Sequence, residues 1–474
     1  MEGESTVKFD RWGSPVTTTS DACISLINSY YHQVLCYGRE RKVIMAAMEE
    51  DRECVLANAL AALFLFSRDT SAASRHLQVA AARLGRATSY EKLLYDSVSS
   101  IMNGTDCETV VALHSKLLRE FPRDLASLNR AQALCFYMGR PDLSLGLVEQ
   151  QVLPENQQES YIYGMLAFPL LELGRMSDAE ISARKGLEIN KSDPWSQHAL
   201  CHVFQYECHF REAVKFMEEC SPSWIDCSSF MYTHNWWHVA LCYMDGHSPL
   251  NRILDIYDRH IWAELQRDDA DCAEVYLNAL GLWLRVDVRG WIGYTGNRLR
   301  NLANCLLNQE SWHVDWLLDL LSVWALAHIG EIPRAEDLVK SIKSRLYSMS
   351  QKKQQSLHKG VLLAEALFEY GRGDYQHAYD ILGPDFNANN FKVIGASDEQ
   401  LDVFNEVWYT ILLNTGYTSK AIGEIEKRLQ HRSGVPFLWN LLEKAYILAD
   451  KREDAAVAKE KVTTLEHAYF KQVL

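Results

Sequence analysis

The sequence predicts an all-α protein in which antiparallel helix pairs stack into a right-handed superhelix, an irregular α-solenoid. Three observations predict this fold. A turn signature recurs along the chain, several of its copies lie about 34 residues apart, and the period-2 alternation that marks β-strands is nearly absent. The composition agrees with a folded protein, because 48% of the 474 residues are hydrophobic and only 23% are charged.

The turn signature is a glycine or another turn-forming residue followed five positions later by a small residue. Glycine ends one helix in a left-handed turn, and the small residue lets the next helix approach its partner closely. The signature occurs at Gly139 with Ser144, Gly174 with Ala179, Cys208 with Ala213, Gly330 with Ala335, Gly373 with Ala378, Gly416 with Ala421, and Asp450 with Ala455.

The spacing of these turns identifies the repeat. Gly139, Gly174 and Cys208 are separated by 35 and 34 residues, whereas Gly330, Gly373 and Gly416 are separated by 43 each. Thirty-four residues is the period of the tetratricopeptide repeat, a helix–turn–helix unit that buries its apolar face only against its neighbours. The sequence therefore predicts an irregular tetratricopeptide-type α-solenoid with a concave inner surface.

A stretch rich in glycine and aromatic residues interrupts the helical pattern. Gly290, Gly293 and Gly296 surround Trp291 and Tyr294 there. We therefore predict four regions: an N-terminal extension at 1–20, an N-terminal helical-repeat half at 21–285, the interruption at 286–300, and a C-terminal helical-repeat half at 301–474.

Charge and apolar runs exclude several classes of partner. The 48 Lys and Arg against 62 Asp and Glu leave a net charge of −14, so nucleic acid is not an expected partner. The first residues carry acids where a signal peptide has a basic region, and the longest apolar stretch, 54–66, is short of the roughly 20 residues that span a membrane. We expect a cytoplasmic protein with no membrane partner.

Motifs of common enzyme and cofactor sites are missing from the sequence. No two of the 12 cysteines form a CxxC pair. The chain also has no GxSxG elbow, no Walker A loop and no GxGxxG fingerprint. We therefore predict no cofactor and assign no residue as a metal ligand.

Two HxxxH spacings, His198 with His202 and His234 with His238, are the feature least typical of a plain scaffold. Residues four apart share one face of a helix, and the two pairs lie 36 positions apart, close to one repeat. We therefore expect all four to face one another, as candidate catalytic residues acting as general acid and base. Metal coordination is the less favoured interpretation, because spacing alone does not set a tetrahedral ligand geometry.

Other residues close to the histidines in the sequence are candidates for ligand binding. They are Trp195, Tyr206, Glu180, Trp236 and Trp237. The structural alternative for the same residues is that the imidazoles and aromatic rings only pack and form hydrogen bonds inside the protein.

A combination of residues spread over most of the chain resembles a known family. The combination is Asp10, Trp12, Gly13 and Pro15, then Phe121 to Leu125, Ala167 with Phe168, Glu172 with Gly174, His198 with His202, Thr233 to Leu241, and Gly371 to Tyr375. In these residues the chain resembles the tetratricopeptide repeat protein 38 family. The resemblance implies an all-helical repeat protein and assigns no biochemical activity.

Two functions remain open on the sequence alone. The leading hypothesis is a binding protein that holds a peptide, a partner protein or a small-molecule ligand in its concave groove. The alternative is an enzyme that acts on a small molecule in an enclosed superhelix pocket through the paired histidines. The enzyme requires the histidines to converge on a closed site with displaced pKa values, whereas a scaffold leaves them scattered or individually hydrogen-bonded.

Overall fold

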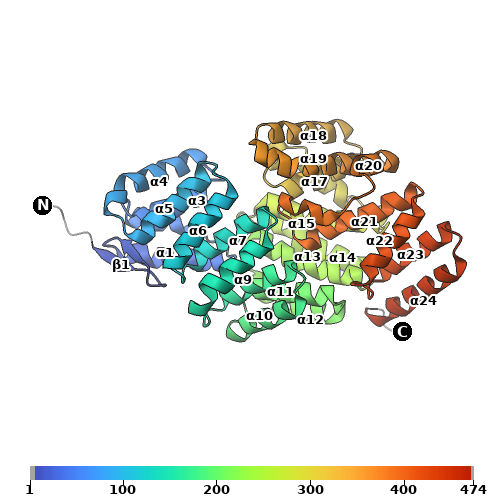
Figure 1. The fold of residues 1–474 in the computed structure, drawn as a ribbon, viewed down its shortest axis with the longest axis horizontal. Helices are drawn as coiled ribbons and strands as arrows, with labels where there is room; N and C mark the ends of the chain where they lie inside the picture. Colours follow the sequence, from blue (N-terminus) through green and yellow to red (C-terminus); the bar gives the residue numbers. More distant parts are fainter. Residues whose placement is uncertain (1–5, 471–474) are drawn as a thin grey trace. The chain divides into compact units, whose positions relative to one another are not determined.

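The computed structural model describes residues 6–470, and about 75% of the chain is helical. Helices account for almost all of the regular structure in this range (Figure 1). The one sheet within it pairs strands β1 (Val7–Phe9) and β2 (Pro15–Thr17) antiparallel, with Val7 opposite Thr17. The predicted all-α class is confirmed, and the hairpin lies in the region predicted as an N-terminal extension.

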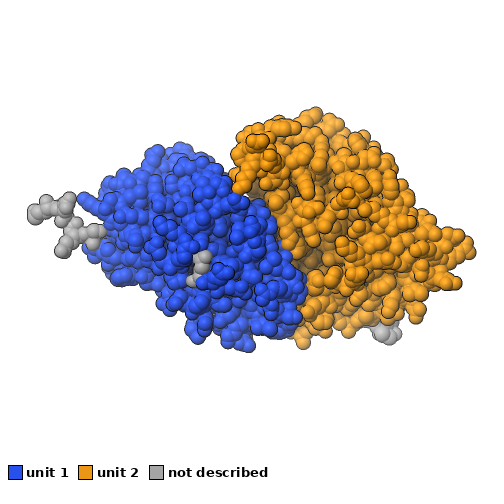
Figure 2. All heavy atoms as spheres, viewed as in Figure 1, with its two compact units in different colours: residues 1–200, 226–228 blue, residues 201–225, 229–474 orange. Residues whose placement is uncertain are grey.

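The chain divides into two compact units, coloured separately in Figure 2. Unit 1 contains residues 1–200 and 226–228, and unit 2 contains residues 201–225 and 229–474. The division falls within helix α11 (Pro194–Tyr206). The glycine-rich stretch 286–300 lies inside unit 2, where it includes a short 3₁₀ turn at Ile292–Tyr294.

Unit 1 contains the following helices before α11 in its described residues. They are α1 (Asp21–Leu35), α2 (Val43–Glu50), α3 (Val55–Leu65), α4 (Thr70–Arg83), α5 (Ser89–Met102), α6 (Cys107–Glu120), α7 (Leu125–Tyr137), α8 (Pro141–Leu147), α9 (Tyr161–Glu172) and α10 (Met176–Ile189).

Unit 2 continues the same helical pattern after α11. Its further helices in the described residues are α12 (Phe210–Cys220), α13 (Ser229–Asp245), α14 (Leu250–Ile256), α15 (Cys272–Val288), α16 (Arg298–Cys305), α17 (Trp316–His328), α18 (Ile332–Tyr347), α19 (Gln351–Arg372), α20 (Tyr375–Leu382), α21 (Asp398–Asn414), α22 (Thr418–Leu429), α23 (Pro436–Leu448) and α24 (Arg452–Ala468). No helix in residues 6–470 combines the length and the apolar run that crossing a membrane requires.

All seven predicted helix-pair turns adopt the left-handed backbone conformation. The φ angle is +75° at Gly174, and it is also positive at the two turns without glycine, +62° at Cys208 and +55° at Asp450. After α9, the amide of Arg175 donates to the carbonyl of Leu170 at 2.9 Å, which satisfies a carbonyl at the end of the helix. The small residue five positions after each turn is buried, as the signature predicts.

Helix α13 is buried along most of its length, although it carries several polar side chains. Thr233, His234, Asn235 and His238 are all shielded from solvent. Buried polar groups need partners, because an unpaired one loses its hydration without compensation. The next question is therefore which side chains contact the two histidines of α13.

Candidate functional site

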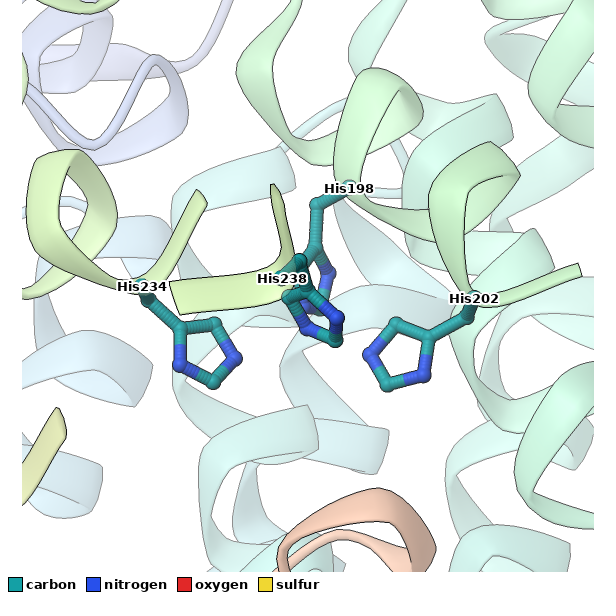
Figure 3. Close-up of side chains that lie close together, drawn as sticks. All are labelled: His198, His202, His234 and His238. Carbon is teal, nitrogen blue, oxygen red and sulfur yellow. The ribbon is translucent and has the colours of Figure 1, made fainter. Parts of the chain in front are cut away.

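The four histidines of the two HxxxH pairs come together in space. Helix α11 carries His198 and His202 one turn apart, and helix α13 carries His234 and His238 one turn apart. Each histidine offers one ring nitrogen, and these four nitrogens all lie within 4.8 Å of one another. Figure 3 shows the four imidazoles turned toward one another. We call this group the histidine cluster, and its presence agrees with the expectation from the spacing.

The imidazole rings of the cluster are in direct contact and hidden from solvent. The ring centroids of His202 and His238 are 4.3 Å apart, and those of His234 and His238 are 4.8 Å apart, in both cases with the rings steeply inclined. Side chains at all four positions are at most 5% exposed. The cluster is therefore an interior feature of the protein.

His234 is oriented by an asparagine of helix α15. Its Nδ1 lies 2.8 Å from Oδ1 of Asn278. The amide nitrogen of Asn278 donates to Oγ1 of Thr233 at 2.9 Å and to the carbonyl of Glu274 at 3.2 Å, so the amide oxygen must face the histidine. Nδ1 of His234 therefore carries the hydrogen, and its Nε2 keeps a lone pair.

His238 is oriented in the same way by a glutamine, whose amide nitrogen is held by a carboxylate. The amide nitrogen of Gln205 donates to Oε1 of Glu399 at 3.0 Å, so Oε1 of Gln205 faces Nδ1 of His238, 3.1 Å away. The same reasoning places a hydrogen on Nδ1 of His238 and leaves a lone pair on its Nε2. Two histidines of the cluster thus share one tautomer, each selected by a side-chain amide.

Burial lowers the pKa of two imidazoles of the cluster. Removal from water lowers the pKa of His202 to about 3, with a further contribution from His234. Burial also lowers the pKa of His234 to about 4, although the hydrogen bond with Asn278 acts in the opposite direction. Both rings are uncharged at pH 7.

Two of the five candidate ligand-binding residues contact the cluster. The ring of Trp195 stacks on His198 with centroids 4.6 Å apart, and the ring of Trp237 stacks on His234 with centroids 5.0 Å apart. These rings form an apolar wall that shields the two imidazoles from water.

The other three candidates contact different parts of the protein. Trp236 stacks on His260 with centroids 3.6 Å apart, and Tyr206 lies 6.4 Å from His431. Glu180 forms a surface ion pair with Arg184 at 2.7 Å. We therefore do not retain Trp236, Tyr206 and Glu180 as ligand-binding residues of the cluster.

The carboxylate of Glu399, which accepts from the Gln205 amide, belongs to a network of ion pairs. The side chain of Glu399 is only 12% exposed, and loss of hydration raises its pKa to about 6, although the neighbouring charge of Arg432 lowers it. Arg432 also pairs with Asp245 at 2.7 Å, and Asp245 pairs with Arg289 at 2.7 Å. This network links α13, the C-terminal end of α15, α21 and the segment between α22 and α23, and it holds Glu399 against Gln205.

A small cavity is lined by Trp237 and Asn278, the two residues that contact His234. Its volume is about 10 Å³, which is room for about one water molecule. The rest of the lining comes from Gly281, Arg285, Leu277, Leu317, Leu321, Gln400 and Val403. The guanidinium of Arg285 lies 4.9 Å from the centre of the Trp237 ring.

The residues that orient the histidines were not among the candidates from the sequence. Gln205 had a local signal, because positions 198, 202 and 205 follow the i, i+4, i+7 spacing of one helical face. Asn278 and Glu399 had none, since they belong to distant helices. No model of a known protein family matches the chain. The resemblance to the tetratricopeptide repeat protein 38 family therefore stays an expectation.

Proposed function

We propose that the protein is a tetratricopeptide-type α-solenoid that binds a small ligand in its interior, at the histidine cluster. The regular left-handed turns and the intervals near 34 residues support the solenoid arrangement. The convergence of four histidine nitrogens within 4.8 Å is the observation that carries the ligand site.

The energetics of the cluster support a functional role over a purely structural one. Packing four imidazoles into the interior removes eight ring nitrogens from water, and apolar side chains of similar volume carry no such penalty. Side-chain amides also hold two of the rings in a defined tautomer. A preorganised binding site requires side chains that are fixed in one orientation and one tautomer, as these two rings are.

The histidines converge and two of them have displaced pKa values, as the enzyme hypothesis requires, so the direction of the displacement bears on the choice between two chemical roles. A histidine with a pKa of about 3 or 4 carries no proton to donate at pH 7, and it is a weak base. General acid and base catalysis by His202 and His234 is therefore disfavoured. A neutral imidazole always has one unprotonated ring nitrogen, which suits a ligand that accepts electron density, and the proposal accordingly favours binding over proton transfer.

The test compares what the intact protein and a double variant retain. Full-length protein, purified without chelators, is examined by native mass spectrometry and elemental analysis. The proposal expects a stoichiometric ligand in the wild type, its loss in His202→Gln with His238→Gln, and its retention in the surface control His377→Gln. Equal retention by all three proteins, or no ligand in any of them, contradicts the proposal.

A further inference from the structure

We infer that the ligand of the histidine cluster is a divalent first-row transition-metal ion of the zinc class, bound by ring nitrogens of His198, His202, His234 and His238. This inference rests on the proposed ligand site and names the chemical class of its ligand. It departs from the sequence, which assigned no metal ligand, because only the folded chain brings the four nitrogens together.

The composition of the donor set selects the metal. The group contains four imidazoles and no carboxylate. Calcium and magnesium take oxygen ligands, whereas zinc, copper, nickel and cobalt accept imidazole nitrogen. Four imidazole nitrogen donors therefore exclude the hard cations and match a tetrahedral zinc-type site.

The spacing of the donors is close to what such a site needs. Zinc–nitrogen bonds of about 2.0 Å in a tetrahedron place the donor atoms roughly 3.3 Å apart. The nitrogens of the cluster lie within 4.8 Å of one another, so a closure of at most about 1.5 Å brings the widest pair to bonding geometry. Rotation of the imidazoles about their side-chain bonds supplies movements of this size without moving the helices.

The hydrogen bonds around the cluster are those of a metal site. A metal-bound histidine typically donates its other ring N–H to a side-chain or backbone oxygen, which fixes the tautomer. His234 has this arrangement with Asn278, and His238 has it with Gln205, whose far side is held by Glu399. Because both amides accept from Nδ1, the Nε2 atoms of His234 and His238 are the unprotonated nitrogens that can bind the ion.

A second group of possible ligands gives a useful contrast. Glu369, Asp374 and His377 also bring three donor atoms within 4.8 Å of one another, but Asp374 and His377 are exposed. His377 lies 3.4 Å from Glu369 in what is a surface ion pair when the ring is protonated. This group has neither the burial nor the orienting amides of the cluster, and His377 therefore serves as the control histidine.

The experiment measures metal binding by the full-length protein. Chelator-treated protein is titrated with Zn²⁺ and with Co²⁺, the first followed by calorimetry and the second by visible absorption. We expect one ion per chain, with the intense visible bands of tetrahedral Co²⁺. Asn278→Leu should weaken Zn²⁺ binding about 10- to 100-fold, and His377→Gln should leave it unchanged. Circular dichroism of each variant checks that the helices remain.

The outcomes separate this inference from the proposed function. An organic ligand retained by the wild type, with no stoichiometric Zn²⁺ or Co²⁺ binding, overturns the metal and leaves the ligand site standing. Absence of both organic ligand and metal binding overturns both. The metal titration of the wild-type protein tests the inference by itself, so the test does not depend on whether a histidine variant folds.

Discussion

The amide oxygen of Asn278 lies 2.8 Å from Nδ1 of His234 and connects helix α15 to helix α13. The contact determines which nitrogen of His234 carries the hydrogen, because the other end of the amide is already donating to Thr233. Asn278, 44 positions from His234 in the sequence, thus determines the tautomer of His234 in the cluster.

Replacing this amide by a carboxylate should change the titration of His234. We expect Asn278→Asp to raise the pKa of His234 by about one unit or more, because a negative charge at hydrogen-bond distance favours the imidazolium. Titration of the imidazole signals by NMR measures the change, with Asn278→Leu as the uncharged comparison. An unchanged pKa in Asn278→Asp would show that the contact does not persist in solution.

The repeat turns offer a prediction about backbone strain. Gly174→Val should destabilise the protein by about 1–3 kcal/mol, because valine at positive φ is strained although its Cβ has space around it. Gly146→Ala is the matched control, since Gly146 lies within helix α8 with open space at its Cβ and without positive φ. That change should be neutral or stabilise by about 0.5–1 kcal/mol. Urea denaturation compares the two, and an equal loss in both variants would refute the assigned turn.

The helix-pair contact after the same turn gives a second stability prediction. Ala179 is fully buried on α10, so Ala179→Trp forces a large ring into the space between helices. We expect a loss of about 1–3 kcal/mol, measured by thermal denaturation. Tryptophan at the exposed position Ile181 is the control for the residue type and should have little effect. A stable Ala179→Trp variant would mean that helices α9 and α10 are loosely packed at this position.

A buried histidine outside the cluster predicts acid sensitivity. Burial lowers the pKa of His114 to about 3, and neither of its ring nitrogens has a hydrogen-bond partner among the described residues. The folded pKa lies below the unfolded value of about 6.5, so the unfolded chain takes up the proton first and stability falls as the pH drops from 6.5 toward 3. At pH 5 this loss is on the order of 2 kcal/mol.

Replacement of His114 by leucine isolates this effect. We expect His114→Leu to lose less stability than the wild type between pH 7.5 and pH 5, in urea unfolding at both values. Other ionisable groups contribute equally to both proteins, so the difference reports His114. The same pH dependence in the two proteins would show that this side chain is hydrated in the folded state.

The buried ion network should be sensitive to loss of one carboxylate. Asp245 accepts from both Arg289 and Arg432, whose side chains are almost fully buried. Asp245→Asn leaves these guanidinium groups with less compensation and should reduce stability by about 3–5 kcal/mol. The exposed pair of Asp255 with Arg259 supplies the control, for which Asp255→Asn should change stability by less than about 1 kcal/mol. Comparable losses in both variants would contradict the assigned burial.

The parts of the structure that the sequence predicted depend on neighbouring residues. Each helix-pair turn is determined within about six residues, so the signature located all seven, including Cys208 and Asp450. The hairpin of Val7–Phe9 with Pro15–Thr17 escaped prediction because strands of three residues are too short to show an alternating pattern.

The candidate site was predictable only in its histidines. Trp236 and Trp237 are adjacent in sequence and therefore point about 100° apart on a helix, so only one of them reaches the cluster. Asn278 and Glu399 come from helices whose packing against α11 and α13 no local pattern encodes. For the same reason the sequence assigned no metal, because a ligand set requires positions in space.

The location of the bound ion is the measurement that tests the central claim most directly. Crystals of the full-length protein soaked in Zn²⁺ are measured on both sides of the zinc absorption edge. We predict an anomalous difference peak within about 2.1 Å of ring nitrogens of His202, His234 and His238, with His198 completing the tetrahedron. Zinc bound only at surface residues such as His377, with no peak between the four imidazoles, would contradict the account.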